Sequence, residues 1–209
     1  TPDAVLFHFP GVARYLVQCG NQITIDPEAD APESQIRLFL LGTAAALLLH
    51  QRGVLPLHAS GIRTEKGAVM FSGHSGFGKS TLLAIFMDRG YRMLTDDLAA
   101  VHLDENNKPQ VYPSFPHLKL WADSAENLNK ATDGLRRVRP DFDKFSIPIC
   151  EPVENQPAPL YAIYVLAPRN EADIRLEPLH DARKFNIFLE HTWQKMALKR
   201  MNRHAAHFR

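Results

Sequence analysis

The sequence feature that most restricts the fold is the stretch GHSGFGKS at residues 73–80. It fits the pattern G-x-x-x-x-G-K-[ST], which forms a phosphate-binding loop when a strand precedes it and a helix follows it. Both neighbours are predicted. Residues 68–71 are a short apolar run with the length of a buried strand, and apolar residues recur at largely helical spacing from Ser80 to Arg89.

In a loop of this kind the glycines let the backbone N–H groups point at phosphate oxygens, and the following helix adds a partial positive charge. Lys79 would reach the terminal phosphates, and the Ser80 hydroxyl would ligate Mg²⁺. ATP and Mg²⁺ are therefore the expected cofactors. The residues expected to bind the nucleotide are Gly73, Ser75, Gly76, Phe77, Gly78, Lys79, Ser80 and Thr81. A glycine-rich turn that only resembles the loop is the alternative.

A second chemical group follows the loop. Residues 91–94 are predicted to form a strand that ends at Thr95-Asp96-Asp97. Because only the short loop helix separates this strand from the strand at 68–71, the two should run parallel with their carboxyl ends together. Asp96 and Asp97 would then lie beside the loop, where one carboxylate can hold Mg²⁺ and the other can accept a hydroxyl proton. A helix cap or a solvated turn is the plainer interpretation of the pair.

Other titratable residues are weaker candidates. His58 lies in the strand predicted at 54–62, where it would contact the γ-phosphate or orient a carboxylate, unless it is a half-buried structural histidine. The remaining histidines lack metal-ligand spacing. Residues 130–159 look irregular, and one of their basic side chains could neutralise charge on a transferring phosphoryl group, although a solvated basic face is the alternative for most of them. These side chains are Arg136, Arg137, Arg139 and Lys144.

Composition narrows the class of protein. The 209 residues are 45% hydrophobic, which is enough for a proper core, and 24 Lys and Arg against 23 Asp and Glu give a net charge of +1. This balance offers no electrostatic case for nucleic acid or an acidic membrane. Cys19 and Cys150 are far apart and form no C-x-x-C pattern, so neither a disulfide framework nor a zinc site is suggested and a cytoplasmic location is expected. The apolar stretch 38–49 is too short to cross a bilayer.

The chain order predicts an N-terminal segment at 1–53 and a phosphate-loop domain at 54–209. Residues 1–25 are predicted to be β structure with a hairpin turn at Gly20-Asn21, and a helix capped by Ser34 should run to Gln51. Further expected elements are a hairpin of 99–103 with 110–112, a short helix at 121–129, a strand pair of 161–166 with 174–176, and a surface helix at 182–203. No signal peptide is recognised, and the chain is expected to lack its true N-terminus and a C-terminal piece.

Three motifs together resemble the HPr serine kinase/phosphatase-like family, whose catalytic domain is akin to phosphoenolpyruvate carboxykinase. They are Leu57-His58-Ala59-Ser60, the loop at 73–80, and Thr95-Asp96-Asp97, and the likeness covers about residues 58–121. The resemblance implies an α/β fold with a P-loop kinase core after a small β-rich N-terminal segment. It also implies that Asp96 is the catalytic base, that Asp97 and Ser80 serve the metal, and that His58 lies near the phosphates.

Residues 112–121 and the leucine-rich helix before Gln51 look more like the short homologues found with lasso-peptide biosynthesis. That likeness implies ATP- and Mg²⁺-dependent transfer of the γ-phosphoryl group to a serine hydroxyl of a ribosomally made precursor peptide. An HPr-like carrier protein or a small molecule is the alternative acceptor, and a nucleotide-dependent regulatory module without transfer is the alternative from another class. Relatives of this kind are often homo-oligomers, and neither nucleic acid nor a membrane is an expected partner.

Overall fold

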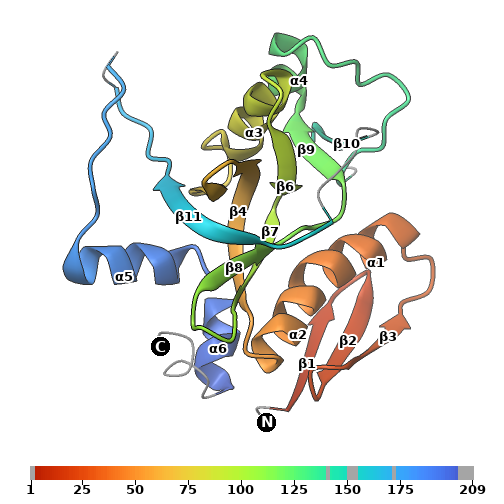
Figure 1. Ribbon diagram of the computed structural model, residues 1–209. Coiled ribbons are helices and arrows are strands. Elements are labelled where there is room, and N and C mark those ends of the chain that lie inside the picture. Colours follow the sequence, from red (N-terminus) through yellow and green to blue (C-terminus); the bar gives the residue numbers. More distant parts are fainter. Residues whose placement is uncertain (1–2, 140–141, 150–154, 171–172, 202–209) are drawn as a thin grey trace.

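A computed structural model describes residues 3–139, 142–149, 155–170 and 173–201 (Figure 1). It is a mixed α/β fold with a small antiparallel sheet at the N-terminus and a larger mixed sheet that carries the phosphate loop. Cys19 is an exposed free thiol, and Cys150 lies outside the described residues. Within the described ranges, no helix is both long and apolar enough to cross a membrane.

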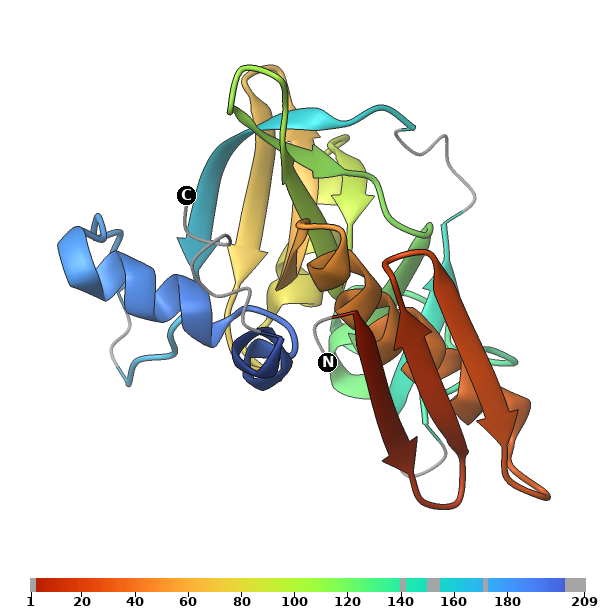
Figure 2. The same ribbon diagram turned by 90° about the horizontal axis from the view of Figure 1, so that it is seen from below.

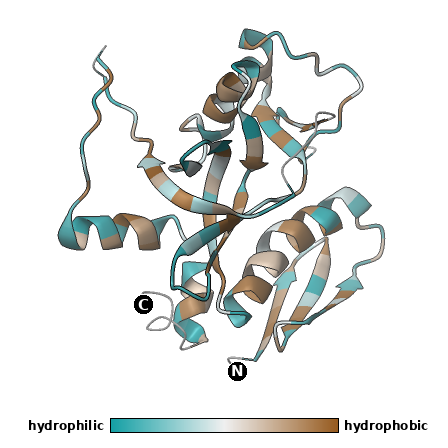
Figure 3. Ribbon diagram, in the orientation of Figure 1, coloured by the Kyte–Doolittle hydropathy of each residue, from teal (hydrophilic) through white to brown (hydrophobic). Residues whose placement is uncertain are grey.

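The N-terminal sheet consists of β1 (Ala4–Phe9), β2 (Ala13–Gln18) and β3 (Gln22–Pro27), all antiparallel, with the predicted turn between β2 and β3. Side chains on β2 alternate between buried and exposed, so one face of the sheet is apolar. A helical segment covers this face through α1 (Glu33–Phe39), the π-helical turn η1 (Leu40–Ala44) and α2 (Ala45–Gln51). Figure 3 shows hydrophobic residues along this segment and alternating hydropathy on the strands.

The expected helix is therefore confirmed, but its expected cap is wrong. Pro32 is the N-cap residue, Ser34 lies inside α1, and no side chain caps the helix. Proline suits this position because its missing N–H would have no partner within the helix. Gln51 ties the helix to the small sheet, since its amide accepts from the Gly20 N–H at 2.8 Å and donates to the Val17 carbonyl at 3.2 Å.

The larger sheet is built around the ten-residue strand β4 (Leu55–Thr64). Its first half pairs with β7 (Leu98–Leu103), and its second half lies between β5 (Gly67–Ser72) and β6 (Arg92–Thr95). All three partners run antiparallel to β4, so β5 and β6 point the same way with their carboxyl ends at one edge. The predicted direction of these strands is confirmed, although they are not neighbours because β4 separates them.

Two further strands, β8 (Pro109–Tyr112) and β11 (Ala158–Val165), complete the larger sheet. β8 forms the predicted hairpin with β7, and β11 pairs antiparallel with β8 and parallel with β5. The strand expected at 174–176 is wrong: these residues are not in a strand, and Ile174 and Leu176 are exposed. β11 instead pairs with β5 over residues 160–165 and with β8 at Ala158 and Pro159.

Two further strands lie beside the phosphate-loop helix α3 (Lys79–Asp88). They are β9 (His117–Trp121), which leads into α4 (Ala122–Asn127), and β10 (Lys144–Pro148), which pairs antiparallel with β9. The region 130–159 is thus not irregular throughout, because it contains β10 and the start of β11. Buried residues of β9, α3 and α4 share one apolar cluster with Ile62 and Phe71.

The expected helix at 182–203 is broken into α5 (Asp181–Glu190) and α6 (Lys195–Arg200). Gln194 between them has φ +53°, a left-handed conformation that an α-helix does not contain. The expectation that this region is only surface is also wrong. Ala197 of α6 and the following Met201 pack into the apolar cluster of the N-terminal sheet, and Figure 2 shows α6 end-on between α5 and that sheet.

Candidate functional site

The phosphate loop connects β5 to α3 as the sequence predicts. Gly78 precedes the helix with φ +83°, a conformation that side chains rarely adopt. Gly73 has φ +150°, and a Cβ built there would lie 3.0 Å from the Leu166 carbonyl oxygen at the end of β11. Gly78 is therefore required for its backbone conformation, and Gly73 for both conformation and space.

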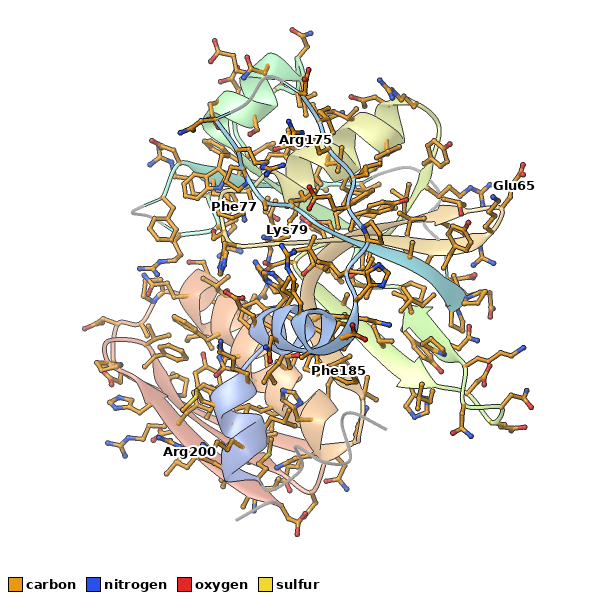
Figure 4. The ribbon with its side chains drawn as sticks, turned by 90° about the vertical axis from the view of Figure 1, so that its left-hand side faces the viewer. Glu65, Phe77, Lys79, Arg175, Phe185 and Arg200 are labelled. Atoms are coloured by element: carbon orange, nitrogen blue, oxygen red, sulfur yellow. The ribbon has the colours of Figure 1, made fainter. Side chains whose placement is uncertain are left out.

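Lys79 is buried inside the loop that it terminates. Its ammonium donates to the carbonyl oxygens of Gly73 at 2.8 Å and His74 at 2.9 Å. Burial lowers the pKa of Lys79 to about 8, with a further contribution from the charge of Lys144. The group is still mostly protonated at neutral pH, so the loop holds a desolvated cation where an anion would bind. Figure 4 shows Lys79 near the middle of the molecule, with Phe77 of the same loop to one side.

Asp96 follows β6 and is almost completely buried. One carboxylate oxygen accepts from the Ser60 hydroxyl at 2.7 Å and from the Ser80 hydroxyl at 2.8 Å, and the other accepts from the Lys119 N–H at 2.8 Å. Burial and the neighbouring charge of Asp97 raise the pKa of Asp96, while these three donors act in the opposite direction. Asp96 thereby links β4, the start of α3 and β9 at one point.

Asp97 has a different environment. Its φ is +72°, and the Leu98 N–H donates to the Asp96 carbonyl at 2.9 Å, so the chain makes a tight turn around it. One carboxylate oxygen pairs with the Lys119 ammonium at 2.6 Å, and the other lies 3.5 Å from Nδ1 of His58. Burial would raise the pKa of Asp97, but nearby positive charge, chiefly that of Lys119, lowers it overall. Asp97 is therefore a carboxylate at neutral pH.

His58 on β4 is the third predicted member of the site. Burial lowers its pKa to about 4, with only partial compensation from Asp97, so the ring is uncharged at neutral pH. Its Nδ1 has no hydrogen-bond partner in the described part of the chain. The ring makes an edge contact with Trp193 at a centroid distance of 5.1 Å. The backbone N–H of His58 donates to the backbone carbonyl of His191 at 2.8 Å.

A cavity of about 240 Å³ joins these groups. Its walls come from β4, the phosphate loop, α3, the turn after β6, β9, α4 and β10. They are formed by His58, Ser75, Gly76, Gly78, Lys79, Ser80, Thr81, Asp97, Lys119, Leu120, Trp121, Asp123, Ser124 and Lys144. Most of the predicted residues thus meet in one space. Gly73, Phe77 and Asp96 are not part of the wall, and Asp96 lies behind the Ser80 hydroxyl.

Several residues of the cavity were not predicted as site residues. Lys119, Trp121, Asp123 and Ser124 carry no motif, although β9 alternates between partly exposed His117, Lys119 and Trp121 and buried Leu118 and Leu120. That period of two was a signal that one face of residues 117–121 looks toward a polar space. Of the four basic candidates in the 130–159 region, only Lys144 lines the cavity. Arg137 instead pairs with Asp143 at 2.8 Å, and Arg139 lies over the Phe142 ring.

Trp193, in the connector between α5 and α6, holds the turn at Asp97 in place. The Trp193 indole N–H donates to the Asp97 carbonyl at 3.0 Å, and the Trp193 N–H donates to the Pro56 carbonyl at 2.9 Å. The Trp193 carbonyl in turn lies 2.7 Å from Nε2 of His50 on α2. The tight turn at Asp97 is therefore held by residues nearly one hundred positions later in the chain, a contact that no local pattern indicates.

Mg²⁺ would find suitable donors beside the loop. The Ser80 hydroxyl lines the cavity next to Lys79, with the Asp96 carboxylate 2.8 Å away from it. Among the described residues, no group of three or more His, Cys, Asp or Glu side chains could hold a metal alone. This donor set fits an ion that arrives with a triphosphate, because Mg²⁺ takes few protein ligands and completes its shell with phosphate oxygens and water.

Comparisons with known proteins give a partial likeness. No protein-family model matches the chain, and no curated protein matches it. Among solved structures, the chain is similar to the HPr(Ser) kinase/phosphatase from Coxiella burnetii, with 22% sequence identity and a TM-score of 0.28. The match covers 44% of this chain and 60% of that one. At these values the likeness is too distant to support an argument about function, which has to come from the site itself.

Proposed function

We propose that this protein is an ATP- and Mg²⁺-dependent kinase that transfers the γ-phosphoryl group to a serine hydroxyl. The observation that supports this most strongly is the shared cavity, in which the phosphate loop with Lys79 and Ser80 faces the carboxylate of Asp97. A carboxylate at the same opening as the phosphate loop can take the proton of an attacking hydroxyl during phosphoryl transfer.

The geometry favours a division of work between the two acids that differs from the one the family resemblance implies. The Asp96 carboxylate accepts three hydrogen bonds, from Ser60, Ser80 and the Lys119 N–H, and it does not line the cavity, so it would orient the Ser80 hydroxyl that holds Mg²⁺. Asp97 lines the cavity and would act as the base. Uncharged His58 would keep one side of Asp97 free of a competing positive charge.

The proposed reaction then runs as follows. The loop N–H groups and Lys79 would bind the β- and γ-phosphates, and the Ser80 hydroxyl would hold Mg²⁺, which would supply charge neutralisation on the phosphate oxygens. The acceptor hydroxyl attacks the γ-phosphorus as its proton passes to a carboxylate oxygen of Asp97. The bond between the γ-phosphorus and the bridging oxygen breaks, and that oxygen leaves with its electron pair on ADP. Lys119, which pairs with Asp97 before the proton arrives, remains as a cation beside it.

The acceptor we propose is a serine of a ribosomally made precursor peptide, an assignment supported by the sequence resemblance alone. Incubation with ATP, Mg²⁺ and serine peptides, followed by mass spectrometry, would identify a phosphorylated product. Asp97→Asn should lower transfer at least about 100-fold while ATP affinity stays within about threefold, since the base acts only on the acceptor. Asp96→Asn should weaken the binding of Mg²⁺ and ATP as well.

Two outcomes would contradict this proposal in different ways. Normal transfer by Asp97→Asn, together with lost turnover and intact ATP affinity in Asp96→Asn, would return the base to Asp96. Slow hydrolysis of ATP with no acceptor modified, combined with nucleotide-dependent binding of a partner protein, would instead favour the regulatory module.

A further inference from the structure

The cation Lys144 has no role in the reaction described above. It is the first residue of β10 and stands opposite Trp121 of β9 in the antiparallel pairing. Its ammonium lies over the Trp121 ring, 6.0 Å from the ring centroid, and the side chain lines the cavity with Lys79 and Lys119. The pairing of β9 with β10 therefore brings a lysine from the 130–159 region to the cavity of the phosphate loop.

The three lysines of this cavity differ in the groups that their ammonium groups contact. Lys119 is paired with Asp97 at 2.6 Å, and Lys79 donates to two loop carbonyls. Lys144 forms no ion pair within the part of the chain that the structure describes, and only the π-face of Trp121 lies under it. An ammonium group that lines a cavity without a carboxylate partner attracts an anion that enters the same cavity.

The charge of Lys144 also affects other groups of the cavity. It contributes to lowering the pKa of both Lys79 and Asp97, so it lies within electrostatic range of the phosphate loop and of the proposed base. The cavity wall carries three lysines, Lys79, Lys119 and Lys144, against the two carboxylates of Asp97 and Asp123. Of these lysines, only Lys119 forms an ion pair with a carboxylate of the described residues, so Lys79 and Lys144 are available for a negatively charged ligand. A polyphosphate carries several negative charges and matches such a pair.

We propose that Lys144 is the second phosphate-binding cation of this cavity and that it contacts, together with Lys79, the polyphosphate tail of the nucleotide. Trp121 supports the lysine through a cation–π contact, so that the ammonium is held in place before the ligand arrives. The ligand class is a polyphosphate, either as the tail of a nucleoside triphosphate or as free tripolyphosphate. This inference rests on the proposed nucleotide site but not on the identity of the acceptor.

The test uses Lys144→Met, which keeps an unbranched side chain one atom shorter and removes the charge, and Lys144→Arg, which keeps the charge. Lys66→Met is a matched control, because the Lys66 ammonium also lies over an aromatic ring, 5.5 Å from the centroid of Tyr161, but outside the cavity. Calorimetric titrations with ATP, inorganic tripolyphosphate and adenosine would compare the variants with the original protein. Thermal unfolding of each variant would show that it is folded.

We expect Lys144→Met to weaken binding of both ATP and tripolyphosphate at least about tenfold, the loss typical of one charge-assisted contact. Lys144→Arg should recover most of the affinity, Lys66→Met should bind both ligands normally, and adenosine binding should be the same in all variants. If Lys144→Met also binds ATP and tripolyphosphate normally while Lys79→Met does not, the role of Lys144 is refuted and the nucleotide site stands.

Comparing the titrations with ATP and with tripolyphosphate also separates this inference from the proposed function. If the original protein binds tripolyphosphate in a manner that depends on Lys144 but does not bind ATP, the cavity is a polyphosphate site and the kinase proposal fails. If it binds neither ligand, both proposals fail together.

Discussion

The hydrogen bond from the Ser60 hydroxyl to the buried Asp96 carboxylate allows a quantitative prediction about stability. Ser60 is completely buried on β4 and donates to Asp96 at 2.7 Å, beside the two other donors, Ser80 and the Lys119 N–H. A hydrogen bond to a charged group contributes about 1.5–3 kcal/mol, against about 1 kcal/mol for one between neutral groups. Ser60→Ala should therefore lower the free energy of unfolding by about 2 kcal/mol.

The neighbouring strand supplies a matched control. Ser72 at the end of β5 is also buried, but its hydroxyl donates to the neutral His58 carbonyl oxygen at 3.2 Å. Ser72→Ala removes the same atom from a similar position and should cost about 1 kcal/mol. Urea denaturation of the ligand-free protein, followed by circular dichroism, would measure the free energies of unfolding of both variants.

The difference between the two variants should also depend on pH in a defined direction. Burial raises the pKa of Asp96, and Ser60 opposes that shift by stabilising the charged form. Removing Ser60 raises the folded-state pKa further, so the cost of Ser60→Ala is largest where Asp96 is charged and shrinks as the pH falls through its folded-state pKa. The cost of Ser72→Ala should be the same throughout. Equal costs for the two variants, or a cost of Ser60→Ala that does not change with pH, would refute this account of Asp96.

Two further predictions concern His58 and the last helix. Burial lowers the pKa of His58 from 6.5 to about 4, so between these values the unfolded chain binds a proton that the folded chain does not. The stability that the uncharged ring contributes is present above the unfolded pKa and is lost as the pH falls. Between pH 7 and pH 5, the free energy of unfolding of the original protein, measured by urea denaturation, should therefore fall by roughly 2 kcal/mol more than that of His58→Gln. Equal decreases would contradict the buried, uncharged ring. Met201 lies in the apolar cluster of the N-terminal sheet, so Met201→Ala should cost about 2–5 kcal/mol, whereas Met196→Ala on the exposed face of α6 should cost little. Thermal unfolding would compare the two, and similar stabilities would show that α6 does not dock on that sheet.

Local sequence patterns were sufficient for much of this protein. The glycine and lysine pattern at 73–80 predicted the loop between β5 and α3, because that backbone conformation depends on residues that are adjacent in the chain. The turn at Gly20-Asn21 and the hairpin of β7 with β8 were predicted for the same reason. The crossover argument also placed Asp96 and Asp97 beside the loop, where Ser80 and Asp96 are hydrogen-bonded.

Tertiary structure decided what those residues can do. The order of two adjacent acids does not reveal that Asp96 is enclosed by donors from β4, α3 and β9 while Asp97 faces the cavity. Lys119 and Trp121 join the site because β9 packs beside α3 and Asp96, and Lys144 joins it through the pairing of β10 with β9. β11 pairs with β5 and β8 rather than with the residues that follow it. α5 ends at Glu190, and the left-handed Gln194 begins α6, which packs on the N-terminal sheet through Ala197 and the following Met201. Conformation within a turn or a helix depends on neighbours in sequence, whereas strand pairing, burial and the charge around a carboxylate depend on segments that meet only when the whole chain has folded.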